Sequence, residues 1–269
     1  MNLERQRILI TGAGGGIGAA LCAQLVERKA RLCLVDRNPD AAEAIQRRLH
    51  DSGAEIRVVP ADITRPDERA RAVDVTLEVW NGVDVLINLA GLLNFTRFDA
   101  QNPDDIQRML QVNIEAPLQL TRRLLPQMLE RGQGRIVNVG SMFGSIGFPC
   151  FATYSATKFA LRGFSQALRR ELAGSGVGVT YVSPRAVRTP FNPPVVHHMA
   201  EIGLMHMDDP APVARRIVGG IEKDRDEVYI GFPESLFARL NAILPGLVGR
   251  AIARQVPVLR SYAKEQAGA

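Results

Sequence analysis

Short apolar runs alternate with longer amphipathic segments between Arg7 and Ile230. Runs rich in Ile, Leu and Val are typical of buried strands, and apolar positions that recur every three or four residues are typical of helices. Strands are expected at Arg7–Ile10, Arg31–Val35, Ile56–Val59, Val83–Asn88, Arg135–Val139, Gly178–Val182 and Glu227–Ile230. Helices are expected at Ile17–Lys29, Pro39–Asp51, Pro66–Trp80, Pro103 to about Glu130, Thr153–Ala173 and Pro212–Lys223.

Apolar strands that are separated by helices indicate a parallel sheet covered on both faces. Right-handed crossovers then give a doubly wound α/β Rossmann fold, in which ligands bind at the carboxyl ends of the strands. We expect one such domain over residues 1–231, with a mostly parallel sheet of roughly seven strands. Residues 232–269 are expected to form a basic, amphipathic helical extension.

Composition excludes several classes of protein. Apolar residues make up 46% of the 269 positions and charged residues 23%, which excludes a disordered, collagenous or disulfide-scaffold chain. Apolar runs are shorter than the roughly 20 residues of a membrane span, and no secretory leader is expected before the first strand. Three scattered cysteines, Cys22, Cys33 and Cys150, predict reduced thiols and a cytoplasmic location. The net charge of +5 is too small to indicate a nucleic-acid partner.

A glycine-rich turn, Thr11-Gly12-Ala13-Gly14-Gly15-Gly16-Ile17-Gly18, joins the first strand to its helix. Glycines let the backbone turn tightly and approach an anion, and the start of the helix directs its N–H groups to the same place. We therefore expect a bound diphosphate, although Ile17 breaks the general Gly-x-Gly-x-x-Gly spacing counted from Gly12. A glycine-rich turn without a ligand is the alternative.

Acidic residues follow the next two strands. Asp36 closes the second strand, where a carboxylate binds the ribose hydroxyls of NAD and repels the 2′-phosphate of NADP. The adjacent guanidinium of Arg37 could hold that phosphate, so NADP is the alternative to NAD. Asp62 and Ile63, after the third strand, are expected beside the adenine.

Tyr154 and Lys158 lie one helical turn apart and therefore share one face of their helix. The ordinary pKa of a phenol, about 10, is too high for proton exchange at neutral pH, and a nearby ammonium group lowers it. The chain contains only four lysines among 33 basic residues, so a lysine at this position indicates a specific role.

Together these motifs resemble the short-chain dehydrogenase/reductase family. The glycine pattern from Thr11 to Gly18 is typical of that family, and Tyr154-x-x-x-Lys158 matches its catalytic pair. By the same resemblance, Ser141 and Asn113 complete the catalytic set. The resemblance implies hydride transfer between a nicotinamide and a secondary alcohol or ketone, without a metal. An NADPH-dependent 3-oxoacyl or ketone reductase is the alternative enzyme, and a catalytically idle nucleotide sensor is the alternative from another class.

The resemblance also implies a role for each residue. Ser141 stabilises the substrate oxygen, Tyr154 exchanges the proton, and Lys158 holds the nicotinamide ribose and lowers the phenol pKa. Asn113 anchors a water that connects Lys158 to solvent. The implied cofactor-binding residues are Gly12, Gly16, Ile17, Gly18, Asp36, Arg37, Asp62, Ile63, Asn88, Ala90, Tyr154, Lys158, Val187 and Thr189.

Two segments depart from the family pattern. Asn88-Leu89-Ala90-Gly91 has a leucine where relatives have a second asparagine, in a motif that mainly braces the sheet. Arg185 stands where glycine is usual, and is expected to narrow the cleft or to contact the substrate.

Apolar residues dominate the segments that relatives use to bind substrate, including a lid loop at residues 191–209. A bulky apolar alcohol or ketone, such as a lipid, sterol or retinoid, suits them, and packing of these residues on one another or on a partner subunit is the alternative. The expected substrate-binding residues are Ser141, Phe143, Phe148, Arg185 and Phe191.

The extension carries apolar residues at helical spacing with arginines around them, and Pro245 and Gly246 are expected to break it. It could lie on an anionic membrane, cover the cleft or contact another subunit. The resemblance implies a homodimer or homotetramer. Although His197, His198 and His206 lie near two aspartates, no metal site is expected, because adjacent histidines on a loop rarely converge on one ion.

Overall fold

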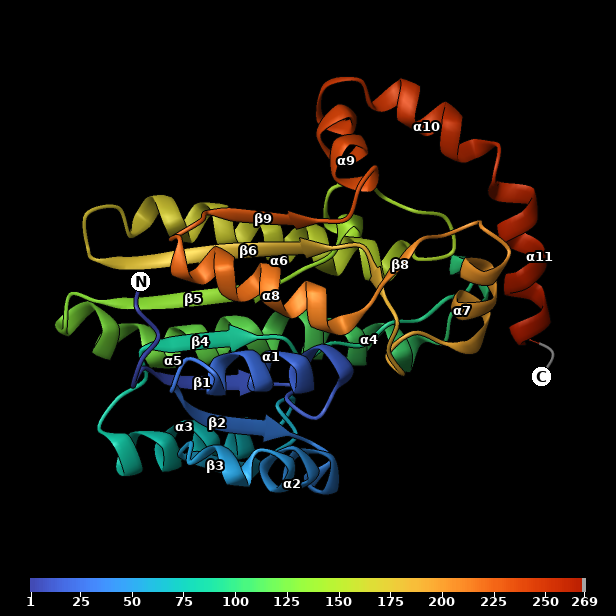
Figure 1. Ribbon diagram of the computed structural model, residues 1–269. Coiled ribbons are helices and arrows are strands. Elements are labelled where there is room, and N and C mark those ends of the chain that lie inside the picture. The colour runs from blue at the N-terminus through green and yellow to red at the C-terminus, as the bar shows by residue number, and fades with distance from the viewer. Residues whose placement is uncertain (268–269) are drawn as a thin grey trace.

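A seven-stranded parallel sheet forms the centre of the computed structural model, which describes the backbone of residues 1–267 and the side chains of residues 1–263 (Figure 1). The strands lie in the order β3-β2-β1-β4-β5-β6-β9, and every neighbouring pair is parallel. Their bounds are β1 Arg7–Thr11, β2 Arg31–Asp36, β3 Ile56–Pro60, β4 Val85–Asn88, β5 Gly134–Val139, β6 Val177–Pro184 and β9 Glu227–Ile230. The predicted doubly wound α/β fold is confirmed.

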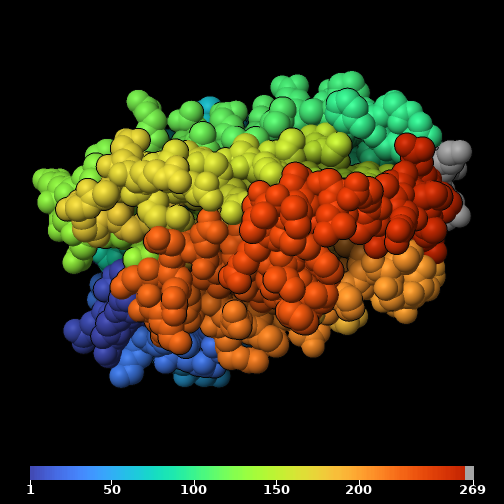
Figure 2. Space-filling model, turned by 90° about the horizontal axis from the view of Figure 1, so that it is seen from above, coloured from blue at the N-terminus to red at the C-terminus, as the bar shows by residue number. Residues whose placement is uncertain are grey.

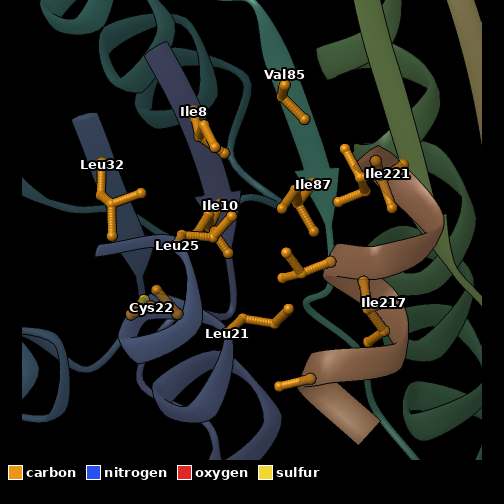
Figure 3. Close-up of a cluster of buried hydrophobic side chains, with 14 of the residues drawn as sticks. Ile8, Ile10, Leu21, Cys22, Leu25, Leu32, Val85, Ile87, Ile217 and Ile221 are labelled. Atoms are coloured by element: carbon orange, nitrogen blue, oxygen red, sulfur yellow. The ribbon is translucent and has the colours of Figure 1, made fainter. Parts of the chain in front are cut away.

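Helices cover both faces of this sheet. One layer contains α1 Gly16–Val26, α2 Pro39–Arg48 and α8 Pro210–Glu222, and the other contains α3 Pro66–Trp80, α4 Pro103–Leu110, α5 Ala116–Glu130 and α6 Ala152–Glu171. Figure 3 shows the first layer, where Leu21 and Leu25 of α1 and Ile217 of α8 belong to the same buried cluster as Ile10 of β1 and Ile87 of β4. These side chains are fully buried, as expected for strands that are apolar on both faces.

The predicted long helix from Pro103 to about Glu130 is present, but a wide π-helical turn, Gln111–Glu115, interrupts its α-helical geometry between α4 and α5. Pro117 explains the interruption. In an α-helix its nitrogen would donate to the carbonyl of Asn113, and proline has no N–H with which to do so. Since π turns often occur at functional sites, the position of Asn113 within this one is significant.

The predicted lid at residues 191–209 contains regular structure. It includes helix α7 Pro194–Glu201 and strand β8 Met207–Asp208, which pairs with β7 Ala186–Val187. Short 3₁₀ turns occur at His50–Ser52, Phe98–Ala100 and Met142–Gly144.

The C-terminal extension forms three helices, α9 Glu234–Ile243, α10 Pro245–Ala253 and α11 Val256–Ala267, so the predicted break at Pro245 and Gly246 is confirmed. The helices leave the end of β9 and cross the carboxyl edge of the sheet to reach α7 (Figure 1), and Figure 2 shows them in red over this end of the molecule. Across the part of the chain that the structure describes, no helix is long and apolar enough to cross a membrane.

Candidate active site

One cleft of about 890 Å³ opens at the carboxyl ends of the strands and gathers nearly all the predicted site residues. It is lined by Gly12, Gly16, Ile17, Gly18, Asp36, Arg37, Asp62, Ile63, Ala90, Ser141, Phe143, Phe148, Tyr154, Lys158, Arg185, Val187, Thr189 and Phe191. Asn88 and Asn113 are the two predicted residues that lie outside its lining.

Close packing of backbone segments shapes the glycine turn at one end of the cleft. Gly12 has φ +70°, and a Cβ there would lie 2.7 Å from the Cα of Ala90. A Cβ on Gly16 would lie 2.5 Å from the Cγ2 of Thr189. Helix α1 begins after Gly15 with no side chain capping it, so the N–H groups of its first turn are available to an anion. These features fit the diphosphate of a dinucleotide.

Asp36 closes the same end of the cleft with a carboxylate held by two backbone N–H groups. Its Oδ2 accepts from Gly14 at 2.8 Å and its Oδ1 accepts from Asn38 at 2.9 Å. Arg37 lines the cleft directly beside it. Asp62 also lines the cleft, but its carboxylate accepts from the N–H and the hydroxyl of Thr64, so this side chain caps its own turn.

Helix α6 carries Tyr154 and Lys158, and the loop after β5 carries Ser141. The Lys158 ammonium lies 5.5 Å from the centre of the Tyr154 ring and donates to the carbonyl of Val139 at 3.1 Å. The Ser141 side chain is near enough to Tyr154 to lower the pKa of the phenol, and its oxygen accepts from the N–H of Phe143 at 3.2 Å. The two hydroxyls and the ammonium therefore meet at the floor of the cleft.

Burial is the main cause of the pKa shifts of Tyr154 and Lys158. It raises the pKa of Tyr154 to about 12, although the hydrogen bond from Ser141 opposes the shift, and it lowers the pKa of Lys158 to about 8. The expectation that Lys158 lowers the phenol pKa is therefore not met in this structure. The reason is geometric, because the ammonium lies beside the ring and is bonded to Val139.

Asn113 connects two walls of the site from behind. Its Oδ1 accepts from the N–H of Leu92 at 2.7 Å, and its Nδ2 donates to the Leu92 carbonyl at 2.9 Å and to the Thr157 hydroxyl at 3.0 Å. Asn113 therefore fixes the loop after β4 against α6, next to Lys158. Its predicted water-mediated role remains a prediction.

Asn88 lies outside the lining of the cleft. Its side chain is buried between strands and donates to Asn138 Oδ1 at 2.8 Å, and Asn138 in turn donates to Ser165 of α6 at 2.9 Å. The bracing role of its motif agrees with these bonds, and the assignment of Asn88 to the cofactor stays a prediction.

Tyr181 is a residue of the site that the sequence reasoning missed. Its hydroxyl lies under the catalytic loop, 3.4 Å from the N–H and 3.3 Å from the carbonyl of Ser141, and 3.5 Å from the carbonyl of Lys158. Burial raises its pKa, so it stays a neutral donor. A phenol hydroxyl inside a buried strand was the available signal, because such a group needs a partner.

Aromatic and aliphatic side chains form the substrate end of the cleft. Phe143 and Phe148 stack with ring centres 4.9 Å apart, and Phe191 lies 6.4 Å from Tyr154. Residues of the lid and of the extension complete the wall, so the structure places the extension over the cleft, one of its three expected locations. Val196 of the lid and Leu240 and Val248 of the extension line this end as those segments predicted, whereas the lining residues that the sequence reasoning missed include Leu92, Leu93, Phe237 and Ile252.

The three histidines of the lid have three separate partners. His197 lies 3.1 Å from the carbonyl of Thr189, His198 lies 3.6 Å from Glu201, and His206 lies 2.8 Å from Glu234. Within residues 1–263, no group of three or more His, Cys, Asp or Glu side chains is arranged to hold a metal ion.

Comparisons with known proteins agree with this geometry. The chain matches the family model of short chain dehydrogenases over residues 6–200. It is 32% identical over 254 residues to an uncharacterized oxidoreductase of Staphylococcus saprophyticus, covering 93% of this chain and 89% of that protein.

Two solved structures are similar over most of the chain. A short-chain dehydrogenase of Sphingobium yanoikuyae in complex with NADPH is 29% identical, with a TM-score of 0.79, covering 91% of this chain and 95% of that one. A 3-ketoacyl-(acyl-carrier-protein) reductase of Brucella melitensis complexed with NADH is 26% identical, with a TM-score of 0.79, covering 87% and 99%.

The buried ammonium predicts a stability cost that depends on pH. Replacing Lys158 by Met should raise the free energy of unfolding by about 2 kcal/mol at pH 7, because the variant no longer buries a charge. Between pH 8 and the ordinary value of 10.5, the unfolded wild type binds more protons than the folded one, so its stability rises with pH and the difference shrinks. Urea unfolding at pH 7 and pH 9 measures both effects.

The exposed lysine at the end of α8 provides the control, and Lys223→Met should leave stability nearly unchanged at both pH values. A Lys158→Met variant that is less stable than the wild type at pH 7 would show that the ammonium stabilises the fold.

Proposed function

The chain belongs to the short-chain dehydrogenase/reductase family and is an NAD(P)-dependent oxidoreductase acting on CH–OH groups, and we propose that it uses NAD and acts on bulky, apolar secondary alcohols or ketones. One observation carries the proposal. Ser141, Tyr154 and Lys158 meet at the floor of a cleft that has a glycine turn at one end and an apolar wall at the other.

The side chains of this site supply the proton chemistry. In reduction Tyr154 gives its proton to the substrate oxygen, and in oxidation it accepts that proton. Ser141 donates a hydrogen bond to the same oxygen and stabilises the developing alkoxide. Lys158 uses one donor on Val139, which leaves its others for a ribose hydroxyl. Gly12, Gly16 and Asp36 would hold the dinucleotide, whose nicotinamide supplies or accepts the hydride when bound.

The protonation of the pair suits the reductive step. A phenol whose pKa is raised to about 12 is fully protonated at neutral pH and is ready to donate. Oxidation needs the phenolate, so the pKa of Tyr154 must fall during that step, as a cation next to the phenol oxygen would make it do.

The apolar wall favours a bulky substrate. Burying apolar surface is the main source of affinity in such a cleft, and a stacked aromatic pair provides a large flat surface next to the reacting groups. A 3-oxoacyl reductase remains the second candidate, since one structural relative carries that name.

The choice of NAD rests on Asp36. Its carboxylate, fixed by the N–H groups of Gly14 and Asn38, faces the place where the adenosine ribose of a dinucleotide lies in this fold. A 2′-phosphate there would be repelled, and Arg37 alone opposes that repulsion.

Removing the phenol hydroxyl tests the proposed proton donor. Tyr154→Phe should reduce turnover of a twelve-carbon secondary alcohol or ketone by at least about 1,000-fold, since it removes both the proton exchange and the hydrogen bond to the substrate. Cofactor affinity, measured by fluorescence titration, should change less than about threefold. Turnover close to that of the wild type would refute the assignment.

Removing the acidic group at β2 tests the cofactor. Asp36→Ala should weaken NAD binding by about tenfold and strengthen NADP binding, because the ribose loses a charged acceptor and the repulsion disappears. Calorimetric titration with both cofactors measures the change. Asp40→Ala, the same change on the exposed first turn of α2, is the control. A wild type that prefers NADP would contradict the proposal.

The C-terminal extension has an exposed side that could meet a membrane surface. We infer a cytoplasmic homodimer or homotetramer whose extension touches an anionic membrane surface. Phe232 and Ile243, at the two ends of α9, are 75% and 76% exposed, and the exposed arginines Arg250 and Arg254 lie on α10 and directly after it. Exposed apolar side chains and cations on one segment suit the interface of an anionic bilayer.

Vesicle flotation tests this contact. The wild type should float with vesicles of phosphatidylglycerol and phosphatidylcholine, and Phe232→Ser combined with Ile243→Ser should reduce the bound fraction at least fivefold. Leu129→Ser combined with Phe159→Ser changes two exposed residues on α5 and α6 and is the matched control. If the double variant floats as well as the wild type, or if the two substitutions change only the oligomer mass in solution, Phe232 and Ile243 do not contact the membrane.

A further inference from the structure

Four charged or titratable side chains meet beside the apolar end of the cleft, and three of them, Arg185, His206 and Glu234, line it. Arg185 Nη2 donates to Asp208 Oδ1 at 2.6 Å, and its Nη1 donates to Glu234 Oε2 and to the carbonyl of Phe232, both at 3.0 Å. The other Glu234 oxygen lies 2.8 Å from His206 Nδ1. We refer to Arg185, His206, Asp208 and Glu234 as the Arg185 cluster.

The members of the Arg185 cluster come from three separate parts of the chain. Arg185 directly follows β6, Asp208 and His206 end the lid, and Glu234 begins the extension. The guanidinium therefore joins the lid and the extension to the edge of the sheet. The side chains of Arg185, Asp208 and Glu234 are only 17 to 27% exposed, so these charge-assisted bonds are poorly screened by solvent.

Gly231 provides the space that Arg185 occupies. Its φ of +110° lies in a region that favours glycine, and a Cβ there would lie 2.6 Å from Arg185 Cδ. The planar fork of arginine can bond two carboxylates and a carbonyl at once, whereas a lysine ammonium offers one point charge. Arg185 thus bonds its neighbours in the wall, and the substrate contact expected from the sequence stays a prediction.

The lid and the extension also pack directly on each other. Met199 of α7 and Leu259 of α11 belong to one buried apolar cluster, and His198 contacts the ring of Tyr262 edge-on. With the Arg185 cluster at one end of this contact, residues 191–209 and 232–263 form a continuous wall.

We propose that Arg185 is a specificity-determining positioning residue, which holds the lid and the extension together as one wall and so favours long, uncharged substrates. The inference rests on the proposed function, because it assumes that this cleft binds an apolar alcohol or ketone. In the Arg185 cluster the carboxylates of Asp208 and Glu234 outnumber the one guanidinium, so the cluster disfavours an anionic group on the substrate.

A homologous series of 2-alkanols from four to twelve carbons, oxidised with NAD, measures this effect. In the wild type kcat/KM should rise with length, by up to about fourfold for each methylene that the wall buries. In Arg185→Gly and Glu234→Gln the ratio of kcat/KM between the longest and the shortest alcohol should fall at least tenfold, mainly through KM. Arg185→Lys should restore part of the ratio. An unchanged ratio in both variants would overturn the proposal.

Asp209→Asn is the matched control, because it removes an exposed ion pair with Arg188 at the same end of the lid. It should keep the wild-type ratio. A control that loses the ratio as fully as Arg185→Gly would show that any change at this end of the lid has the effect, and would also overturn the proposal.

A second measurement does not depend on turnover. The extension contains Arg239, Arg250 and Arg254, and trypsin should cleave there at least fivefold faster in Arg185→Gly and Glu234→Gln than in the wild type or Asp209→Asn. Equal cleavage in all four proteins would overturn the proposal. A wild type that oxidises none of the alcohols would contradict the proposed function, whereas the cleavage rates would still decide whether the Arg185 cluster holds the wall.

Discussion

Burial of the Lys158 ammonium is the constraint on which the site depends. A charge enclosed by protein is tolerated only where it has fixed polar partners, and here the carbonyl of Val139 and the face of the Tyr154 ring provide them. The same burial lowers the pKa of the lysine and raises that of the phenol, so each group becomes more sensitive to any charge that enters the cleft. The site is therefore built to respond to what binds in it.

Neutral hydrogen bonds behind the site hold this pair in place. Tyr181 bonds the backbone of Ser141 from below, Asn113 joins the loop after β4 to α6, and Asn138 joins β5 to the same helix. None of the three lines the cleft, yet each is buried and bonded to another element. Rigidity at the catalytic residues thus comes from polar groups inside an apolar sheet, where an unpaired group would be costly.

The sequence allowed the sheet and the glycine turn to be predicted, because each depends on local patterns that lie close together in the chain. The candidate catalytic residues came from the resemblance to a family, and three of them, Ser141, Tyr154 and Lys158, line one cleft. Contacts between distant segments could not be predicted in this way. The π turn at Asn113 follows from Pro117, whose missing N–H was available in the sequence, but the bonds from Asn113 to Leu92 and Thr157 require the folded chain. For the same reason the bond from Asn88 to Asn138 across the sheet was not predicted.

The residues proposed for the chemistry and those proposed to select the substrate lie in different parts of the fold. The groups that carry out the chemistry lie on the sheet edge and on α6, whose positions follow from the fold. The apolar wall is made by the lid and the extension, which the pattern of strands and helices does not place. Arg185 connects these two systems, because its backbone N–H donates to Ile230 of β9 while its guanidinium reaches both wall segments. A change in the wall can therefore alter the preferred substrate without moving the residues that transfer the proton.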